Sequence, residues 1–242
     1  MFFVSIPDGK GLFRMYTCVL FDLDGTVLDT VSDCKTAINR AMDDFSYPHH
    51  TDDEVRSYLN NGARMLIYRA MPEGERENEE KLERVKARYI GYYSEECTKS
   101  SRLYDGILPL LRTLSDAGVS LGIVTNKPDE QTQIMVPHYF GTLFKYYEGN
   151  TDSNPTKPDK RRVFSALDAL GKTPSETIFV GDSYVDVQTA RNAGIPCIGV
   201  AWGFAGIPGF RGNEPDAIAE KASDIADIVF GKTPLKKEGA PC

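Results

Sequence analysis

Apolar and polar positions follow a repeating order over most of this chain. After residue 105, short apolar runs are separated by longer segments in which apolar positions recur every three or four residues. The short runs predict buried strands, and the periodic segments predict helices. Strands are expected at 18–21, 120–124, 144–148, 177–180 and 196–200, and helices at 107–117, 130–139, 157–170 and up to 193. This order predicts an α/β fold with a Rossmann-like parallel sheet and helices on both faces.

The segment 30–102 shows helical spacing alone, and no part of it has the pattern of a strand. Its apolar positions form stripes along one face of each predicted helix, and its other faces are polar. We therefore expect a separate, all-helical bundle inserted into the α/β fold. The expected organisation is a disordered extension at 1–14, a core at 15–29 and 103–235, a helical cap at 30–102 and a tail at 236–242.

Two carboxylates stand directly after the first predicted strand. Asp22 and Asp24 follow the run 18–21, and Gly25 and Thr26 come next. Side chains two residues apart share a face of a strand, so the two carboxylates would converge on a small volume. Close carboxylates repel unless a cation lies between them. Mg²⁺ suits this place, because it prefers oxygen ligands and keeps waters that a phosphate can replace.

Polar residues also follow two other predicted strands. Thr125 comes directly after 120–124, and Asp182 comes directly after Gly181 at the end of another apolar run. Ligands of open parallel sheets bind beyond the carboxyl ends of the strands, so we expect Asp22, Thr125 and Asp182 to meet in one crevice. Thr125 and the next residue, Asn126, suit either a phosphate oxygen or a helix cap.

Charge and composition limit the classes of partner. The 242 residues carry a net charge of −7 with a pI near 5.1, which argues against a nucleic-acid or anionic-membrane surface. The sequence has no apolar stretch near the roughly 20 residues that span a bilayer, so we expect a cytoplasmic protein. The five cysteines are an odd number without a Cys-x-x-Cys pair, which is typical of reduced thiols.

The polar motifs resemble those of one enzyme family, in order and at similar spacing. The stretch 22–26, Asp-Leu-Asp-Gly-Thr, resembles the first motif of the haloacid dehalogenase-like superfamily, most of whose members are Mg²⁺-dependent phosphatases. Thr125-Asn126 resembles the second motif, Lys157 the third, and the stretch 181–186 the fourth. The resemblance extends from Met15 to about Gly231.

The resemblance implies two-step transfer of a phosphoryl group. Asp22 would attack the phosphorus to form an aspartyl-phosphate, and Asp24 would give a proton to the leaving group and later take one from water. Lys157, with Thr125 and Asn126, would bind the phosphate and offset its charge.

The resemblance also implies a Mg²⁺ ion as cofactor. Its ligands would be the carboxylate of Asp22, the backbone carbonyl of Asp24 and the carboxylate of Asp182. Asp186 and Ser183 would lie next to these ligands, and whether Asp186 touches the metal is left open.

A helical insert directly after the first motif resembles the type of cap called C1. The stretch 59–63, Leu-Asn-Asn-Gly-Ala, looks like the cap segment of phosphoglycolate phosphatases, so Asn61 and Gly62 are expected to meet the substrate. The implied substrate is 2-phosphoglycolate or a similar small phosphorylated metabolite, and the implied assembly is a monomer or homodimer. We expect the cap to move as a lid about hinges near Asp29 and Arg102.

Other functions on the same fold remain open from the sequence. A dehalogenase would lack an acid at position 24, so Asp24 argues against it. A β-phosphoglucomutase-like enzyme and a pyrophosphatase would use the same motifs. A non-catalytic binding protein that kept the fold is a further alternative, which release of phosphate from a phosphomonoester would exclude.

Overall fold

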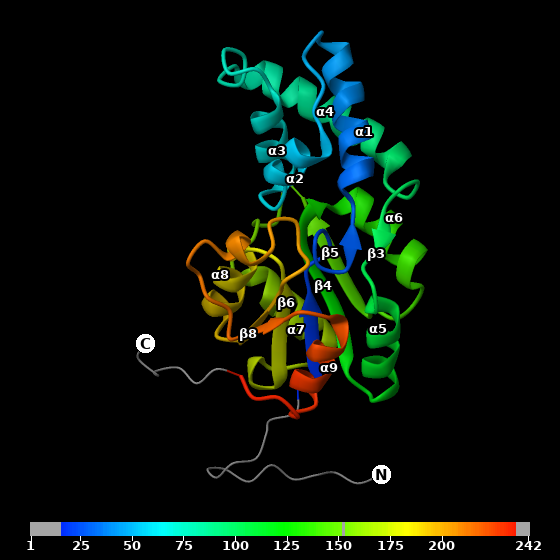
Figure 1. Cartoon of the computed structure of the whole chain (residues 1–242), viewed down its shortest axis with the longest axis vertical. Coiled ribbons are helices and arrows are strands. Elements are labelled where there is room, and N and C mark those ends of the chain that lie inside the picture. The colour runs from blue at the N-terminus through cyan, green and yellow to red at the C-terminus, as the bar shows by residue number, and fades with distance from the viewer. Residues whose placement is uncertain (1–15, 152, 236–242) are drawn as a thin grey trace.

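Six parallel strands form the main sheet in the computed structural model, which describes residues 16–151 and 153–235 (Figure 1). The order across the sheet is β5-β4-β1-β6-β7-β8. The first strand is central, since Phe21 pairs with Ile123 on one side and with Val180 on the other. The strands are β1 (Cys18–Phe21), β4 (Ser120–Pro128), β5 (Tyr146–Asn150), β6 (Thr177–Gly181), β7 (Cys197–Val200) and β8 (Ala217–Ala219).

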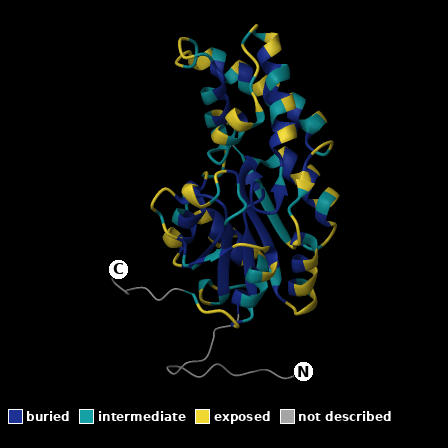
Figure 2. Cartoon of the chain, viewed as in Figure 1, coloured by how far each residue is buried: buried dark blue, intermediate teal, exposed yellow. Residues whose placement is uncertain are grey.

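Helices cover both faces of this sheet. Val19 and Phe21 of β1 pack with α5 (Ile107–Asp116), α6 (Asp129–Phe140) and α9 (Ala222–Val229). The alternate residues Cys18 and Leu20 pack with α7 (Arg161–Leu170) and α8 (Tyr184–Ala193) on the other face. A strand that buries both faces reads as one continuous apolar run, which is the pattern of 18–21. Figure 2 shows this buried layer through the centre of the core.

Residues 31–96 form a helical bundle at one end of the sheet, at the top of Figure 1. Ile38 and Met42 of the first helix are fully buried, as are Leu82 and Val85 of the last. The helices are α1 (Val31–Asp44), α2 (Asp52–Tyr58), α3 (Gly62–Ala70) and α4 (Glu79–Glu96). This bundle, called the cap below, confirms the all-helical insert.

A short antiparallel ribbon connects the cap to the core. Strand β2 (Leu28–Asp29) enters the cap and pairs with β3 (Arg102–Leu103), which leaves it. The buried carboxylate of Asp33 ties the two chain segments together, because it accepts hydrogen bonds from the backbone N–H groups of Ser100 and Ser101, each at 2.8 Å. The two connections between the cap and the core therefore lie side by side.

The α/β fold class is confirmed, and several predicted boundaries were wrong. Strand β4 continues past Thr125, because Pro128 still pairs with Asn150 after an irregularity in the register. Helix α7 begins at Arg161 rather than at Lys157, whose backbone bonds to a neighbouring side chain instead. Strand β5 is 146–150 instead of 144–148, and β8 and α9 were not predicted individually. The expected extension 1–14 and tail 236–242 lie outside the described residues.

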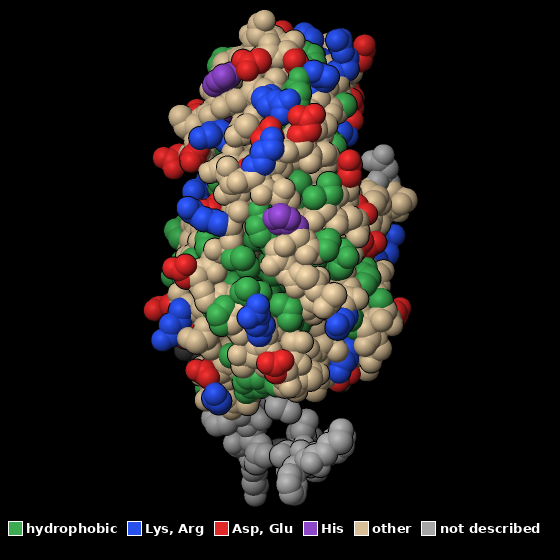
Figure 3. Space-filling view, turned by 90° about the vertical axis from the view of Figure 1, so that its right-hand side faces the viewer, with side chains coloured by type: hydrophobic (Ala, Val, Ile, Leu, Met, Phe, Trp, Pro, Cys, Tyr) green, Lys and Arg blue, Asp and Glu red, His purple; other side chains and the backbone are tan. Residues whose placement is uncertain are grey.

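The surface in Figure 3 carries basic and acidic side chains that are interspersed, without a basic patch among the described residues of this face. Within 16–151 and 153–235, no helix is both long and apolar enough to cross a membrane.

Candidate active site

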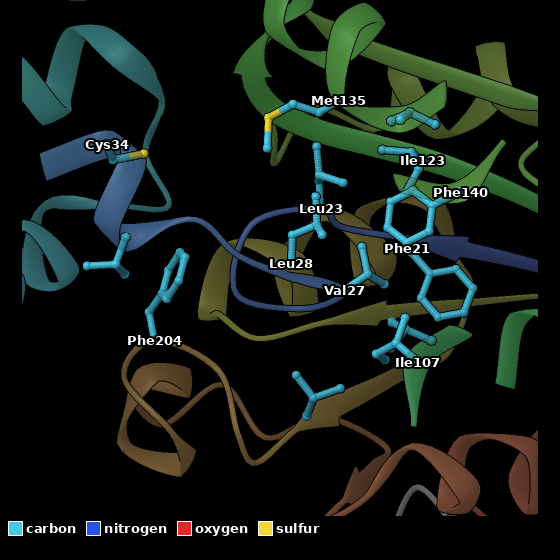
Figure 4. Close-up of a cluster of buried hydrophobic side chains, with 14 of the residues drawn as sticks. Phe21, Leu23, Val27, Leu28, Cys34, Ile107, Ile123, Met135, Phe140 and Phe204 are labelled. Carbon is cyan, nitrogen blue, oxygen red and sulfur yellow. The ribbon is translucent and has the colours of Figure 1, made fainter. Parts of the chain in front are cut away.

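The loop after β1 carries the first two carboxylates. The backbone N–H of Asp22 still bonds to the carbonyl of Val180 at 2.9 Å, so Asp22 stands at the edge of the sheet. Leu23 and Val27 then bury their side chains beside Phe21 and anchor the loop in the core (Figure 4).

Gly25 makes this turn possible for two reasons. Its φ is +81°, a backbone conformation that favours glycine, and a Cβ atom there would lie 2.3 Å from the Asp182 carboxylate. The glycine therefore allows the loop to approach the end of β6. Any larger residue would collide with the Asp182 side chain.

Three buried carboxylates meet at the carboxyl ends of β1 and β6. Oxygen atoms of Asp22, Asp182 and Asp186 all lie within 4.8 Å of one another. Asp186 is held by Ser183, whose backbone N–H and hydroxyl donate to it at 3.0 and 2.7 Å. Burial, and then the charges of Asp186 and Asp22, raise the pKa of Asp182 well above its ordinary value.

Lys157 supplies one positive charge to this cluster. Its ammonium lies 2.8 Å from Asp22 and 2.7 Å from Asp186, and the side chain is almost fully buried. Burial alone would lower the pKa of Lys157, but the neighbouring carboxylates of Asp186 and Asp22 outweigh it and the pKa is raised. Lys157 is therefore charged over the whole physiological pH range.

Asn126 positions Lys157. Its side-chain oxygen accepts from the backbone N–H of Lys157 at 2.8 Å, and its amide donates to the Lys157 carbonyl at 3.3 Å. These bonds connect the end of β4 to the loop before α7. Thr125, one residue earlier, lies on the cavity wall, and its hydroxyl accepts from the backbone N–H of Lys127 at 3.3 Å.

The carboxylate cluster fits a divalent cation. Three carboxylates face a single ammonium, and Oδ1 of Asp182 is buried without a hydrogen-bond partner. An orphaned buried oxygen beside two other carboxylates is a suitable ligand for a hard ion such as Mg²⁺. Asp22 and Asp182, together with Asp186, are the side chains that would hold it.

The Asp24 carboxylate is not part of that cluster and faces the cap. It accepts hydrogen bonds from the Thr30 hydroxyl at 2.9 Å and from the Lys127 ammonium at 2.9 and 3.0 Å. Lys127 also donates to the hydroxyl of Tyr93 in α4 at 2.6 Å. Sequence analysis missed Lys127, although it directly follows the Thr125-Asn126 motif, because a lone lysine is usually a solvated surface charge.

A cavity lies between the cap and the core, next to Asp22. Its volume is about 40 Å³. Core residues on its wall include Asp22, Asp24 and Thr125, and cap residues include Asn60 and Gly62. The cap thus covers the crevice at the end of β1. The remaining lining residues are Cys34, Leu59, Ala63, Leu66, Tyr89, Tyr93, Asn126, Lys127 and Pro128.

The structure places the two predicted cap residues differently. Gly62 lines the cavity with a φ of +80°, and a Cβ atom there would lie 3.5 Å from the carbonyl oxygen of Asn126. The side chain of Asn61 instead bridges the cap and the core, since it donates to the Tyr184 hydroxyl at 3.1 Å and accepts from Arg69 at 2.8 Å. Tyr184 begins α8, so this bond joins the cap to the helix that carries Asp186.

Carboxylates, a buried lysine and a capped crevice at the end of a parallel sheet define a class of enzymes that transfer or hydrolyse phosphoryl groups. The model of the family described as haloacid dehalogenase-like hydrolase matches residues 19–200. The chain belongs to this family, which confirms the resemblance seen in its motifs.

Relatives of known name agree with this assignment. The chain is 31% identical over 215 residues to the phosphoglycolate phosphatase of Mannheimia succiniciproducens, which covers 86% of this chain and 96% of that one. It is 32% identical over 225 residues to the phosphoglycolate phosphatase of Agrobacterium fabrum, with coverages of 91% and 94%. A solved structure of a predicted phosphoglycolate phosphatase from Haemophilus somnus is similar with a TM-score of 0.80 and 29% identity, over 88% of this chain and 97% of that one. The expectation of an enzyme of the phosphatase class is confirmed.

Proposed function

We propose that this protein is a Mg²⁺-dependent phosphomonoester hydrolase that acts through an aspartyl-phosphate, with 2-phosphoglycolate or a similar small metabolite as substrate. The observation that carries the proposal is the place of Asp22. Its carboxylate belongs both to the three-carboxylate cluster and to the wall of the capped cavity. A phosphate in the cavity would therefore meet a nucleophile and a cation site at once.

In the first step an oxygen of Asp22 attacks phosphorus, and the bond from phosphorus to the ester oxygen breaks. Asp24 gives its proton to the departing oxygen, so the alcohol leaves neutral. In the second step Asp24 takes a proton from water, whose oxygen attacks phosphorus and releases phosphate and free Asp22. Asp24 suits the role of general acid and base because it lines the cavity and lies outside the carboxylate cluster.

Lys157 and Thr125 would bind the phosphate group of the substrate. Lys157 contacts the nucleophile directly and offsets the charge of the transferring group. Thr125 and Asn126 line the same cavity. When bound, Mg²⁺ would supply two further positive charges at the oxygens of Asp22 and Asp182, where charge accumulates.

The cap, which we assign to residues 30–102, would open and close over the cavity. Its two connections lie side by side in β2 and β3, so a small rotation there would move the whole bundle. The bond from Asn61 to Tyr184 would hold the closed position. Closure protects the aspartyl-phosphate from all water except the one that reacts.

Two observations support a small substrate. The relatives described above are named phosphoglycolate phosphatases. The cavity beside Asp22 is also small, since its volume is about 40 Å³ and one water already needs about 10–15 Å³ by this measure.

A panel of phosphorylated compounds with Mg²⁺ tests the proposal. We expect phosphate release to be fastest from 2-phosphoglycolate, and slower from p-nitrophenyl phosphate, glucose 6-phosphate and pyrophosphate. The Asp22→Asn variant is the matched control for contaminating phosphatases. Faster turnover of a sugar phosphate or of pyrophosphate would contradict the substrate, and isomerisation of β-glucose 1-phosphate without phosphate release would indicate a mutase.

A further inference from the structure

Lys127 is the only lysine or arginine among the described residues that line the capped cavity. Lys157 lies deeper and is already engaged by Asp22 and Asp186. The side chain of Lys127 is 1% exposed, which is unusual for a lysine. A buried cation on a cavity wall is a candidate for binding an anion there.

Three contacts hold the Lys127 ammonium in place. Two go to the two oxygens of Asp24, and the third goes to the hydroxyl of Tyr93. The ammonium also lies 4.5 Å from the centre of the Tyr93 ring. A lysine has three N–H donors, and one of them is enough to keep a hydrogen bond to Asp24. The second donor to Asp24 is therefore available to a substrate oxygen without a change in the backbone.

The distances suit a carboxylate that is close to the reacting phosphate. In the proposed mechanism the ester oxygen lies within hydrogen-bond distance of Asp24, about 3 Å. Lys127 lies 2.9–3.0 Å from the same Asp24 carboxylate. In a chain O–CH₂–COO⁻, the carboxylate carbon is about 2.4 Å from the ester oxygen, as bond lengths near 1.5 Å require. Such a carboxylate would lie beside Lys127 when its ester oxygen lies beside Asp24.

The rest of the cavity favours this arrangement over a longer substrate. Apart from Asn60, the cap contributes mostly apolar side chains to the cavity wall, including Leu59, Ala63 and Leu66. A sugar would need room and partners for several hydroxyl groups, which these side chains do not provide. A carboxylate buried here without Lys127 would lack a counter-charge, at a high cost in free energy.

We propose that Lys127 determines substrate specificity by binding the carboxylate of a 2-phosphoryloxy carboxylic acid, with Tyr93 holding its ammonium in position. This inference rests on the proposed function and adds to it the residue that recognises the acid group. It predicts that the enzyme distinguishes a carboxylate from a neutral group at the same place.

Two matched substrates test the inference: 2-phosphoglycolate and 2-hydroxyethyl phosphate, in which CH₂OH replaces the carboxylate. Wild-type kcat/KM is expected to favour phosphoglycolate by about 10- to 150-fold, the range for a hydrogen bond to a charged group. Lys127→Met also removes a partner of Asp24, so both substrates are expected to react more slowly. The decisive quantity is the ratio of the two kcat/KM values, which should fall towards one, mainly through a higher KM for phosphoglycolate.

Arg64→Met is the matched control, because it removes a positive charge from the cap helix α3, outside the cavity. Arg64 is half exposed and pairs with Glu79 at 2.7 Å. Its substitution should leave the ratio unchanged. If Lys127→Met does not fold, as judged by circular dichroism, Tyr93→Phe replaces it and should lower the same ratio by a smaller factor.

The kcat/KM values for the two substrates test the role of Lys127 separately from the proposed function. An equal loss on both substrates in Lys127→Met would mean that Lys127 only positions Asp24, which overturns the inference and leaves the proposed function standing. Wild-type protein that turns over 2-hydroxyethyl phosphate as fast as phosphoglycolate, or neither compound, would overturn the proposed substrate and the inference with it.

Discussion

Replacing Asp182 by asparagine should stabilise the protein in the absence of metal. The three carboxylates of Asp22, Asp182 and Asp186 carry three negative charges, and Lys157 offsets one of them. Two unit charges 4.8 Å apart repel by about 3.5 kcal/mol at an effective dielectric constant of about 20. Asparagine removes this repulsion and is nearly isosteric. It also keeps an oxygen for the backbone N–H of Phe204, which donates to Asp182 at 3.0 Å.

Since Lys157 already relieves part of the repulsion, we expect a gain of about 2 kcal/mol in the free energy of unfolding. For a chain of this length, that gain corresponds to an increase in Tm of about 4–8 °C. Thermal unfolding followed by circular dichroism in excess EDTA measures it. Added Mg²⁺ should raise the Tm of the wild type and leave that of Asp182→Asn nearly unchanged, because the variant lacks a ligand.

The stability of the metal-free protein should fall as the pH rises. The pKa of Asp182 is raised above its ordinary value of 3.8, so the folded protein holds this proton more tightly than the unfolded chain. Its contribution to stability is present below about pH 4 and is lost as the pH rises through the raised pKa. The wild type in EDTA should therefore lose stability with rising pH more steeply than Asp182→Asn. A variant that is less stable than the wild type in EDTA at pH 7 to 8 would refute the idea that these carboxylates repel.

Three further predictions concern activity. Asp22→Asn should lower kcat by about a thousandfold or more with an unchanged circular dichroism spectrum, because the amide is a poor nucleophile; retention of a tenth of the activity would exclude Asp22 as the nucleophile. Dialysis against EDTA should abolish phosphate release and Mg²⁺ should restore it, whereas full activity in excess chelator would contradict the metal site. Gly62→Val should raise KM for phosphoglycolate far more than for p-nitrophenyl phosphate, since Gly62 lines the cavity at a φ of +80°; equal effects would separate Gly62 from recognition of the acid group.

The sequence was most informative where one local pattern determines one outcome. An apolar run that is followed by carboxylates predicted β1 and the place of Asp22, because a strand buried on both faces needs apolar residues at every position. Asp182 and Asp186 were placed together for a similar reason, since their spacing is one turn of helix.

Contacts between distant segments could not be predicted in this way. Lys127 and Tyr93 are 34 residues apart, and although Lys127 follows the Thr125-Asn126 motif, no local pattern predicts its contact with Tyr93. The start of α7 was misplaced because Asn126, 31 residues earlier, takes the backbone N–H of Lys157. Asn61 has the sequence of a helix cap, yet Tyr184 and Arg69 bind its side chain. In each case a partner from another element overrides the local preference.

The central position of β1 has a consequence for synthesis of the chain. Both of its neighbours come much later, since β4 begins at Ser120 and β6 at Thr177. At about 5–20 residues per second, a ribosome needs about 5–20 s to make the hundred residues between β1 and β4. The cap helices, whose contacts are more local, can pair during that interval. The strand at 18–21 meanwhile has two open edges and an apolar sequence, the features by which strands associate with other chains. The residues that organise the finished site are thus the ones most exposed to misassembly while the protein is being made.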